Sequence, residues 1–190
     1  LRRAIRDNQL VLHYQPQVNC DTGAVTGAEA LVRWQHPQRG LLMPDSFVQQ
    51  AESSGLIDDL GSWVMREAFR QWRVWADQGI DGVTMAVNVS AMEFGRASFI
   101  PRLRRALDDT EADPDWIELE ITESALMQSL PELIERLGDI ARMGVQLALD
   151  DFGTGYSSLG YLKRLPLNSL KIDKSFVRDL PGDKEDEAIV

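Results

Sequence analysis

The chain has 190 residues, 44% of them hydrophobic and 26% charged, which is typical of one globular domain. Its 20 Lys and Arg against 30 Asp and Glu give a net charge of −10, which excludes the basic surface that polymeric nucleic acid requires. One cysteine, Cys20, excludes a disulfide framework, and two histidines leave too few ligands for a Cys/His zinc site.

No apolar run approaches the ~20 residues that cross a bilayer, and the N-terminal residues lack a signal-peptide pattern. We therefore expect no membrane contact by this segment and a cytoplasmic location, and the domain can still belong to a membrane-anchored protein. Both ends fall within helix-like sequence, which suggests part of a longer domain.

Apolar periodicity and turn residues predict the elements in chain order. A short helix over 1–8 precedes strands over 10–18 and 25–34, which a turn at 21–23 joins in a hairpin-like opening. A loop over 35–43 leads to helices over 44–54 and 57–78. Strands over 83–89, 116–121, 146–150 and 169–172 then alternate with helices over 99–109, from Ser129 to Gly144, and up to about 164. This alternation predicts a mainly parallel sheet covered by helices, either open or closed into a barrel.

From the second strand onward, each strand has one apolar face and one face with a charged or amide side chain, because successive side chains alternate. The polar positions, mostly near the strand C-termini, are Glu29, Arg33, Asn88, Glu120, Asp150, Lys171 and Asp173. An antiparallel sheet with one wet face would alternate similarly, but helices separate these strands. An open doubly wound sheet would bury both faces. We therefore predict an α/β fold of the TIM-like (β/α)8 barrel type, in which inward polar residues line one mouth.

Two adjacent carboxylates, Asp150 and Asp151, end the predicted strand 146–150 and precede glycines at 153 and 155. Since like charges repel, this favours a divalent cation that uses both; an ordinary strand terminus, with Asp151 starting a turn, is the alternative. The converging side chains are hard oxygen donors, so we expect Mg²⁺ or Mn²⁺, as two ions suited to phosphodiester hydrolysis. Arg33 is a candidate phosphate ligand. Lys171 is a candidate for holding a phosphate or the attacking water, or for a buried ion pair with Asp150 or Asp173.

These residues sit in an ordered series of motifs. In chain order, the motifs are Tyr14-Gln-Pro16, Glu29-Ala-Leu-Val-Arg-Trp34, Asn88-Val-Ser90, Glu120-Ile-Thr-Glu-Ser124, Asp150-Asp-Phe-Gly-Thr-Gly-Tyr156 and Leu170-Lys-Ile-Asp173. The series resembles that of the EAL family, bacterial phosphodiesterases of cyclic di-GMP, over essentially the whole chain. A bare Glu-Ala-Leu carries no weight, but the complete series is highly specific.

The resemblance implies a TIM-like barrel with an antiparallel first strand, which agrees with the hairpin-like opening. It implies hydrolysis of cyclic di-GMP to linear pGpG, with Lys171, Glu29 and Asp151 as catalytic residues. The implied metal ligands are Glu29, Asn88, Glu120 and Asp150, with Asp151 at a second metal. The implied substrate contacts are Gln15, Leu31, Arg33 and Asp173. Glu123 would anchor the loop after Asp151, the segment that couples the site to dimerisation in this family.

The family's sequences continue with a helix and two strands that carry an Ala-Glu-Gly-Val-Glu motif and a Gln-Gly-Tyr or Gln-Gly-Phe motif. Neither motif is present, so we expect 1–190 to be a partial EAL domain without the last two strand–helix units. The implied partners are cyclic di-GMP, a second copy in a homodimer, and attached sensor or GGDEF domains. The alternative function is an inactive cyclic di-GMP sensor or scaffold. No motif acid is lost within these residues, which favours the enzyme.

Overall fold

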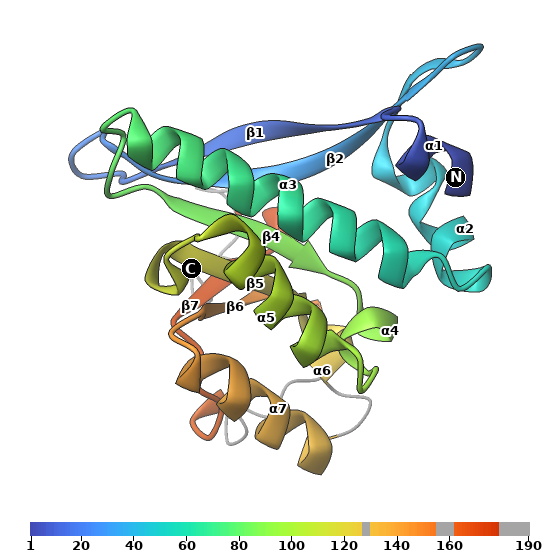
Figure 1. Ribbon diagram of the computed structural model, residues 1–190. Helices are drawn as coiled ribbons and strands as arrows, with labels where there is room; N and C mark the ends of the chain where they lie inside the picture. The colour runs from blue at the N-terminus through green and yellow to red at the C-terminus, as the bar shows by residue number, and fades with distance from the viewer. Residues whose placement is uncertain (127–129, 155–161, 179–190) are drawn as a thin grey trace.

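The computed structural model describes residues 1–126, 130–154 and 162–178 (Figure 1). The strands are β1 (Leu10–Val18), β2 (Val25–His36), β3 (Gly40–Leu42), β4 (Thr84–Val89), β5 (Ile117–Thr122), β6 (Gln146–Phe152) and β7 (Ser169–Ile172). The α-helices are α1 (Arg2–Arg6), α2 (Val48–Ser53), α3 (Ile57–Asp77), α4 (Ala91–Phe94), α5 (Phe99–Thr110), α6 (Glu123–Leu126) and α7 (Leu130–Arg142). Three short 3₁₀ turns are η1 (Pro44–Ser46), η2 (Pro114–Trp116) and η3 (Lys174–Phe176).

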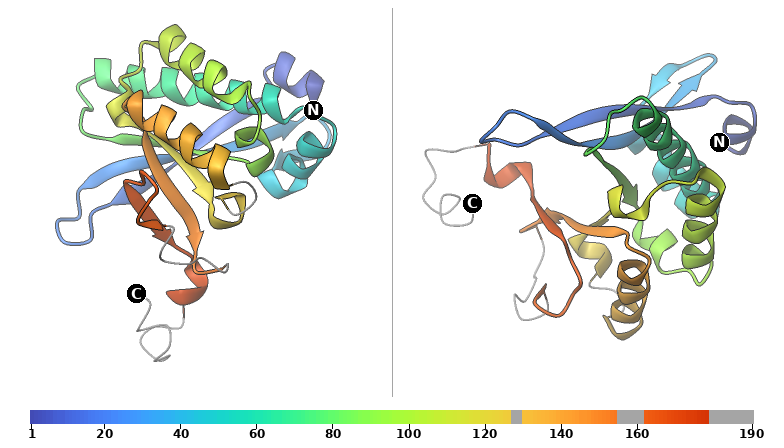
Figure 2. Two further views of the ribbon diagram at one scale, coloured as in Figure 1. Left: turned by 90° about the horizontal axis from the view of Figure 1, so that it is seen from below. Right: turned by 60° about the vertical axis from the view of Figure 1, so that its left-hand side comes forward.

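All these strands belong to one sheet with the order β1-β2-β4-β5-β6-β7, and β3 pairs with β2. β1 and β3 run antiparallel to β2, whereas the pairs from β2 to β7 are parallel. The sheet is curved, and α3, α5 and α7 follow one another along the same face (Figures 1 and 2). This is the wall of a TIM-like barrel with its first strand antiparallel, as the sequence predicts.

The core lies between these helices and the strands. On α3, apolar residues recur every three or four positions, and Leu60, Met65 and Phe69 are buried. Burying side chains of this size contributes about 1.5–3 kcal/mol each. Trp72 of the same helix is buried as well, and its Nε1 donates to the Val83 carbonyl at 3.0 Å. None of the helices in the described ranges combines the length and hydropathy that a bilayer-spanning segment requires.

The predicted elements differ from the structure in three ways. The loop predicted over 35–43 contains β3, and the predictions omitted the one-turn helices α4 and α6. β6 continues to Phe152, so Asp150 and Asp151 lie inside a strand rather than at its end. Ser129, the predicted start of one helix, and most of the helix predicted to end near residue 164 fall outside the described residues.

Candidate active site

Lys171 on β7 stands at the centre of a cluster of acidic side chains from three other strands. Its Nζ lies 2.6 Å from Glu120 Oε2 on β5, 3.3 Å from Glu29 Oε2 on β2 and 3.7 Å from Asp150 Oδ1 on β6. Asn88 on β4 donates from Nδ2 to Glu29 Oε1 at 2.7 Å. The inward alternation predicted for these strands therefore brings these five side chains together, although they span more than 140 positions of sequence.

The parallel register explains the convergence. Asn88 is paired with Glu120, Glu120 with Ala148, and Ala148 with Ser169, so neighbouring strands place their polar residues at similar heights. Side chains two residues apart share a face, which brings Lys171 to the side of Ser169. The convergence follows from pairing between strands rather than from any local motif.

Burial sets the electrostatics of this cluster. The Glu120 side chain is fully excluded from solvent, and this burial raises the pKa of its carboxyl to about 7, although Lys171 acts in the opposite direction. Burial lowers the pKa of Lys171, but its hydrogen bond to Glu120 and the surrounding carboxylates outweigh that effect, so the pKa lies above its ordinary value. Lys171 therefore carries its positive charge at neutral pH.

A β-bulge between Leu149 and Phe152 contains both Asp150 and Asp151. Leu149 pairs with Leu170 and Phe152 pairs with Ile172, so β6 contains one more residue than β7 between these pairs. Asp151 takes up the extra length with a φ of 54°, in the left-handed region. Burial, then the charge of Asp150, raise the pKa of its carboxyl. The bulge explains how two adjacent carboxylates on one strand can serve one mouth.

The loop after the bulge is attached to β5. Glu123, which begins α6 directly after β5, is buried and accepts a hydrogen bond at Oε2 from the Gly153 amide at 3.0 Å. The structure thus places this glutamate against the loop that it is expected to anchor. On the same loop, Thr154 donates from Oγ1 to the Asp151 carbonyl at 2.8 Å.

Residues 1–190 match the family model of the EAL domain. The chain belongs to the EAL domain family. It is 47% identical over its full length to the bifunctional diguanylate cyclase/cyclic di-GMP phosphodiesterase MucR of Pseudomonas aeruginosa, and 48% identical to the cyclic di-GMP phosphodiesterase NbdA of the same organism. The chain spans 28% and 24% of those two proteins.

Solved EAL structures share the fold. A structure described as the PaMucR phosphodiesterase in complex with c-di-GMP superimposes with a TM-score of 0.94 at 47% identity. The match covers 99% of this chain and 76% of that one. The TIM-like barrel predicted from the alternating strands and helices is therefore confirmed.

The four expected substrate contacts are placed outside the group of side chains that surrounds Lys171 in this EAL domain. Gln15 on β1 is exposed and pairs across the sheet with Glu29. Leu31 and Asn88 line a cavity of about 400 Å³ between β2, β4 and α3. Arg33 is largely buried and donates from Nη1 to the Val32 carbonyl at 2.9 Å, and Asp173 caps η3.

Two polar contacts inside the EAL barrel were absent from the sequence predictions. Gln17 Nε2 donates to Glu120 Oε1 at 3.5 Å, and Ser169 Oγ donates to Glu118 Oε2 at 2.6 Å one layer deeper. Alternation could have identified Gln17, because it shares a face with Gln15 two residues earlier.

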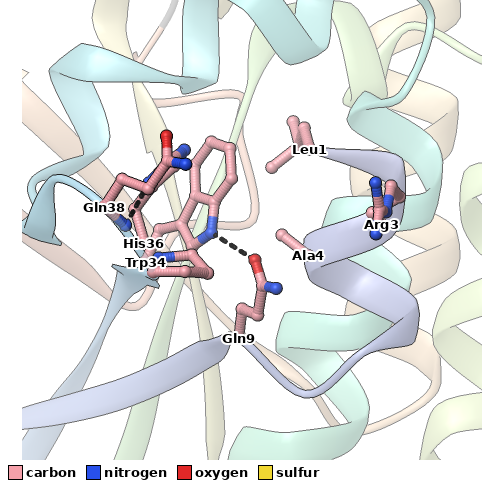
Figure 3. Close-up of a pocket in the computed structure, with 8 residues that line it drawn as sticks. Leu1, Arg3, Ala4, Gln9, Trp34, His36 and Gln38 are labelled. Atoms are coloured by element: carbon pink, nitrogen blue, oxygen red, sulfur yellow. Dashed lines mark hydrogen bonds between the residues drawn. The ribbon is translucent and has the colours of Figure 1, made fainter.

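A second cavity, of about 410 Å³, lies beside α1 and away from these acids (Figure 3). Trp34 Nε1 donates to Gln9 Oε1 at 3.1 Å on its wall. Its lining residues are Leu1, Arg3, Ala4, Gln9, Trp34, His36, Pro37 and Gln38. No carboxylate faces this cavity among the described residues, so it offers no hard anionic ligands for a metal.

The acidic cluster has the donor chemistry that Mg²⁺ or Mn²⁺ requires, namely carboxylate and amide oxygens. In the described ranges, no three acidic, cysteine or histidine side chains form a ready ligand group as they stand. The Lys171 ammonium lies among the carboxylates instead, where it supplies the neutralising charge. A bound cation would compete with this ammonium for the same carboxylate oxygens.

Proposed function

We propose that this EAL domain hydrolyses cyclic di-GMP to linear pGpG in a reaction that depends on Mg²⁺ or Mn²⁺. The observation that carries the proposal is the convergence of Glu29, Glu120, Asp150 and Asn88 around Lys171. The names of MucR and NbdA, which are nearly half identical to the chain, support the same substrate and reaction.

Glu29, Asn88, Glu120 and Asp150 would hold one ion, and Asp151 would serve the second. Bound ions would polarise the phosphodiester and lower the pKa of an attacking water. The fit rests on the hard oxygen donors and on the strong negative charge that they concentrate in one mouth. Asp151 lies on the β6 bulge, so it can turn toward a different position from Asp150.

Lys171 would act on the substrate directly, in contrast to the residues that would hold the metal ions. Once released from Glu120, its ammonium can donate hydrogen bonds to a phosphate oxygen or orient the attacking water. The arginine at position 33 can add a second positive charge to the substrate phosphates if it exchanges its bond to the Val32 carbonyl. Leu31, on the wall of the 400 Å³ cavity, supplies an apolar contact for the substrate.

The proposal includes the setting of the domain. We place it in the cytoplasm, as part of a longer protein with sensor or GGDEF regions, and as a homodimer coupled through the loop that Glu123 holds. The printed name of MucR as a bifunctional diguanylate cyclase and phosphodiesterase supports attached domains, since the chain spans 28% of that protein.

The test is chromatographic detection of pGpG after incubation of the full-length protein with cyclic di-GMP and Mg²⁺, with EDTA as the control. We expect product only when metal is present. A Glu120→Gln variant should give none. Calorimetric binding of cyclic di-GMP without any product would refute the enzyme and identify a sensor.

A further inference from the structure

Gly153, two residues after Asp151, is held from two sides. Its amide donates to Glu123 Oε2 at 3.0 Å, and its Cα faces the ring of Phe176. A Cβ added at this position would lie 2.5 Å from Phe176 Cε2 and 2.9 Å from Cζ, closer than real contacts allow. The φ of +101° also favours glycine. The ring and the carboxylate together therefore fix where this peptide lies.

Phe176 is itself held by a capped turn. The Asp173 carboxylate accepts from the Ser175 amide at 2.9 Å and from Ser175 Oγ at 2.5 Å, which closes η3. The Asp173 amide donates to the Phe152 carbonyl at 3.3 Å, so the segment after β7 is attached to the end of β6. The position of the Phe176 ring is thus coupled to β6 through backbone and side-chain bonds.

Asp151 needs such support. A residue other than glycine in the left-handed region costs on the order of 1–3 kcal/mol and persists only where its surroundings fix it. On the C-terminal side, Thr154 bonds to the Asp151 carbonyl, and Gly153 lies between these two residues. If Gly153 were released, Asp151 could return to an extended conformation and its carboxylate would turn away.

We propose that Phe176 is a positioning residue, which presses on Gly153 and so keeps the Asp151 carboxylate directed at the second metal position. The consequence for turnover rests on the proposed function; the consequence for the backbone does not. Phe176 touches neither substrate nor metal in this account, and acts only through Gly153.

The test compares Phe176→Ala with Val177→Ala in the full-length protein. Val177 is the next residue in the chain and is 49% exposed, so it provides the matched control. For Phe176→Ala we expect the Mn²⁺ concentration at half-maximal activity to rise about tenfold and kcat to fall roughly 10–10²-fold, since misplacement by about 1 Å has such effects. KM for cyclic di-GMP should hardly change. Phe176→Tyr retains the ring and should restore both values, and Val177→Ala should leave them unchanged.

Three further measurements separate the possible failures. Phe176→Leu replaces Phe176→Ala if the smaller side chain prevents folding, and an intermediate loss of Mn²⁺ affinity is expected. In the Gly153→Ala background, Phe176→Ala should cause no further loss, because both changes act on one contact. A crystal structure of Phe176→Ala should show Asp151 outside the left-handed region.

Each outcome bears on one hypothesis. An active wild type with unchanged metal dependence in Phe176→Ala overturns this inference alone. A wild type without pGpG overturns the proposed function, and the φ of Asp151 in the variant then decides the inference. If Asp151 kept its left-handed conformation in Phe176→Ala, the inference about Phe176 would be refuted.

Discussion

The Lys171 ammonium lies 2.6 Å from Glu120 Oε2, although the Glu120 side chain has no contact with solvent. Two further carboxylates, from Glu29 and Asp150, stand within 4 Å of the same nitrogen. The barrel interior thus contains a cation of its own at the position where negative charge is most concentrated. We therefore predict that metal binding at this site is an exchange of one cation for another.

Lys171→Met should remove this competition. Because the carboxylates would lose their internal counter-charge, we expect Mn²⁺ to bind the substrate-free protein roughly tenfold more tightly. Turnover should nevertheless fall about 10²-fold or more, since the phosphate or the attacking water loses its donor. Calorimetry and pGpG assays measure the two effects. Lys163→Met, at an exposed position, is the control. Weaker Mn²⁺ binding in the variant would contradict the exchange.

Glu29→Gln should abolish metal-dependent hydrolysis while the fold persists. The substitution conserves shape but removes a charge from the cluster, and we expect activity to fall at least 10²-fold, as for the loss of a metal ligand or its support. Glu135→Gln, on the exposed face of α7, makes the same chemical change outside the barrel mouth. Equal turnover in the two variants would refute the assignment of Glu29.

The metal requirement should depend on pH through Glu120. Burial raises the pKa of this carboxyl to about 7, so protons occupy it at pH values where an ordinary glutamate is ionised. Metal binding requires the ionised form, and the Mg²⁺ concentration at half-maximal activity should therefore rise by up to tenfold per pH unit below about 7. Activity titrations at pH 6, 7 and 8 would measure this. A requirement that is constant across this range would exclude Glu120 as the titrating ligand.

A buried charge cluster outside the mouth should matter for stability. Arg102 on α5 lies 3.0 Å from the buried Glu93 carboxylate and 3.3 Å from Asp58 Oδ1 on α3. Arg102→Met would remove the ion-pair partner of the buried Glu93, whereas Asp58 keeps Arg96 at 2.7 Å, and should lower the free energy of unfolding by about 3–5 kcal/mol at pH 8. Arg105→Met, on the exposed side of the same helix, should change it by less than about 0.5 kcal/mol. Urea unfolding gives both values.

The loss in Arg102→Met should shrink at acid pH. Burial raises the pKa of Glu93 to about 7 in the folded protein, whereas the unfolded chain has the ordinary value near 4.5. The folded state therefore binds more protons between these values, and the contribution of this group to stability is greatest at low pH and declines as pH rises toward 7. Without the positive charge of Arg102, protonation of the buried Glu93 carboxylate stabilises the folded protein more strongly. A loss as large at pH 5 as at pH 8 would contradict this account.

Strand positions and faces were predictable because alternation is a local property of the sequence. Glu29, Glu120 and Asp150 were placed inside the barrel from period two alone, and the parallel pairing then set them at similar heights. Short elements such as β3 and α4 were not predictable. Their few residues carry no full period of hydrophobicity, and pairing with β2 defines β3.

The bulge in β6 and the contact between Gly153 and Phe176 could not be predicted from the sequence either. The extra residue in β6 is defined by comparison with β7, about twenty positions later, and not by any local pattern. Likewise, the sequence around Gly153 predicts a turn. Its close contact with Phe176 depends on how the segments after β6 and β7 pack together. The role of Asp173 as the cap of η3 explains why this motif residue points to its own backbone rather than to the carboxylates.

The shift of register in β6 leaves one carboxylate of the pair in regular strand pairing and places the other in the irregular part of the same strand. Asp150 is fixed by pairing with Thr122, whereas the direction of Asp151 depends on a glycine and an aromatic ring. Sequence changes elsewhere could therefore disable the second metal position while every acidic residue is retained. We expect a relative with every acidic motif intact, but a different residue at the position of Gly153 or Phe176, to bind cyclic di-GMP without hydrolysing it.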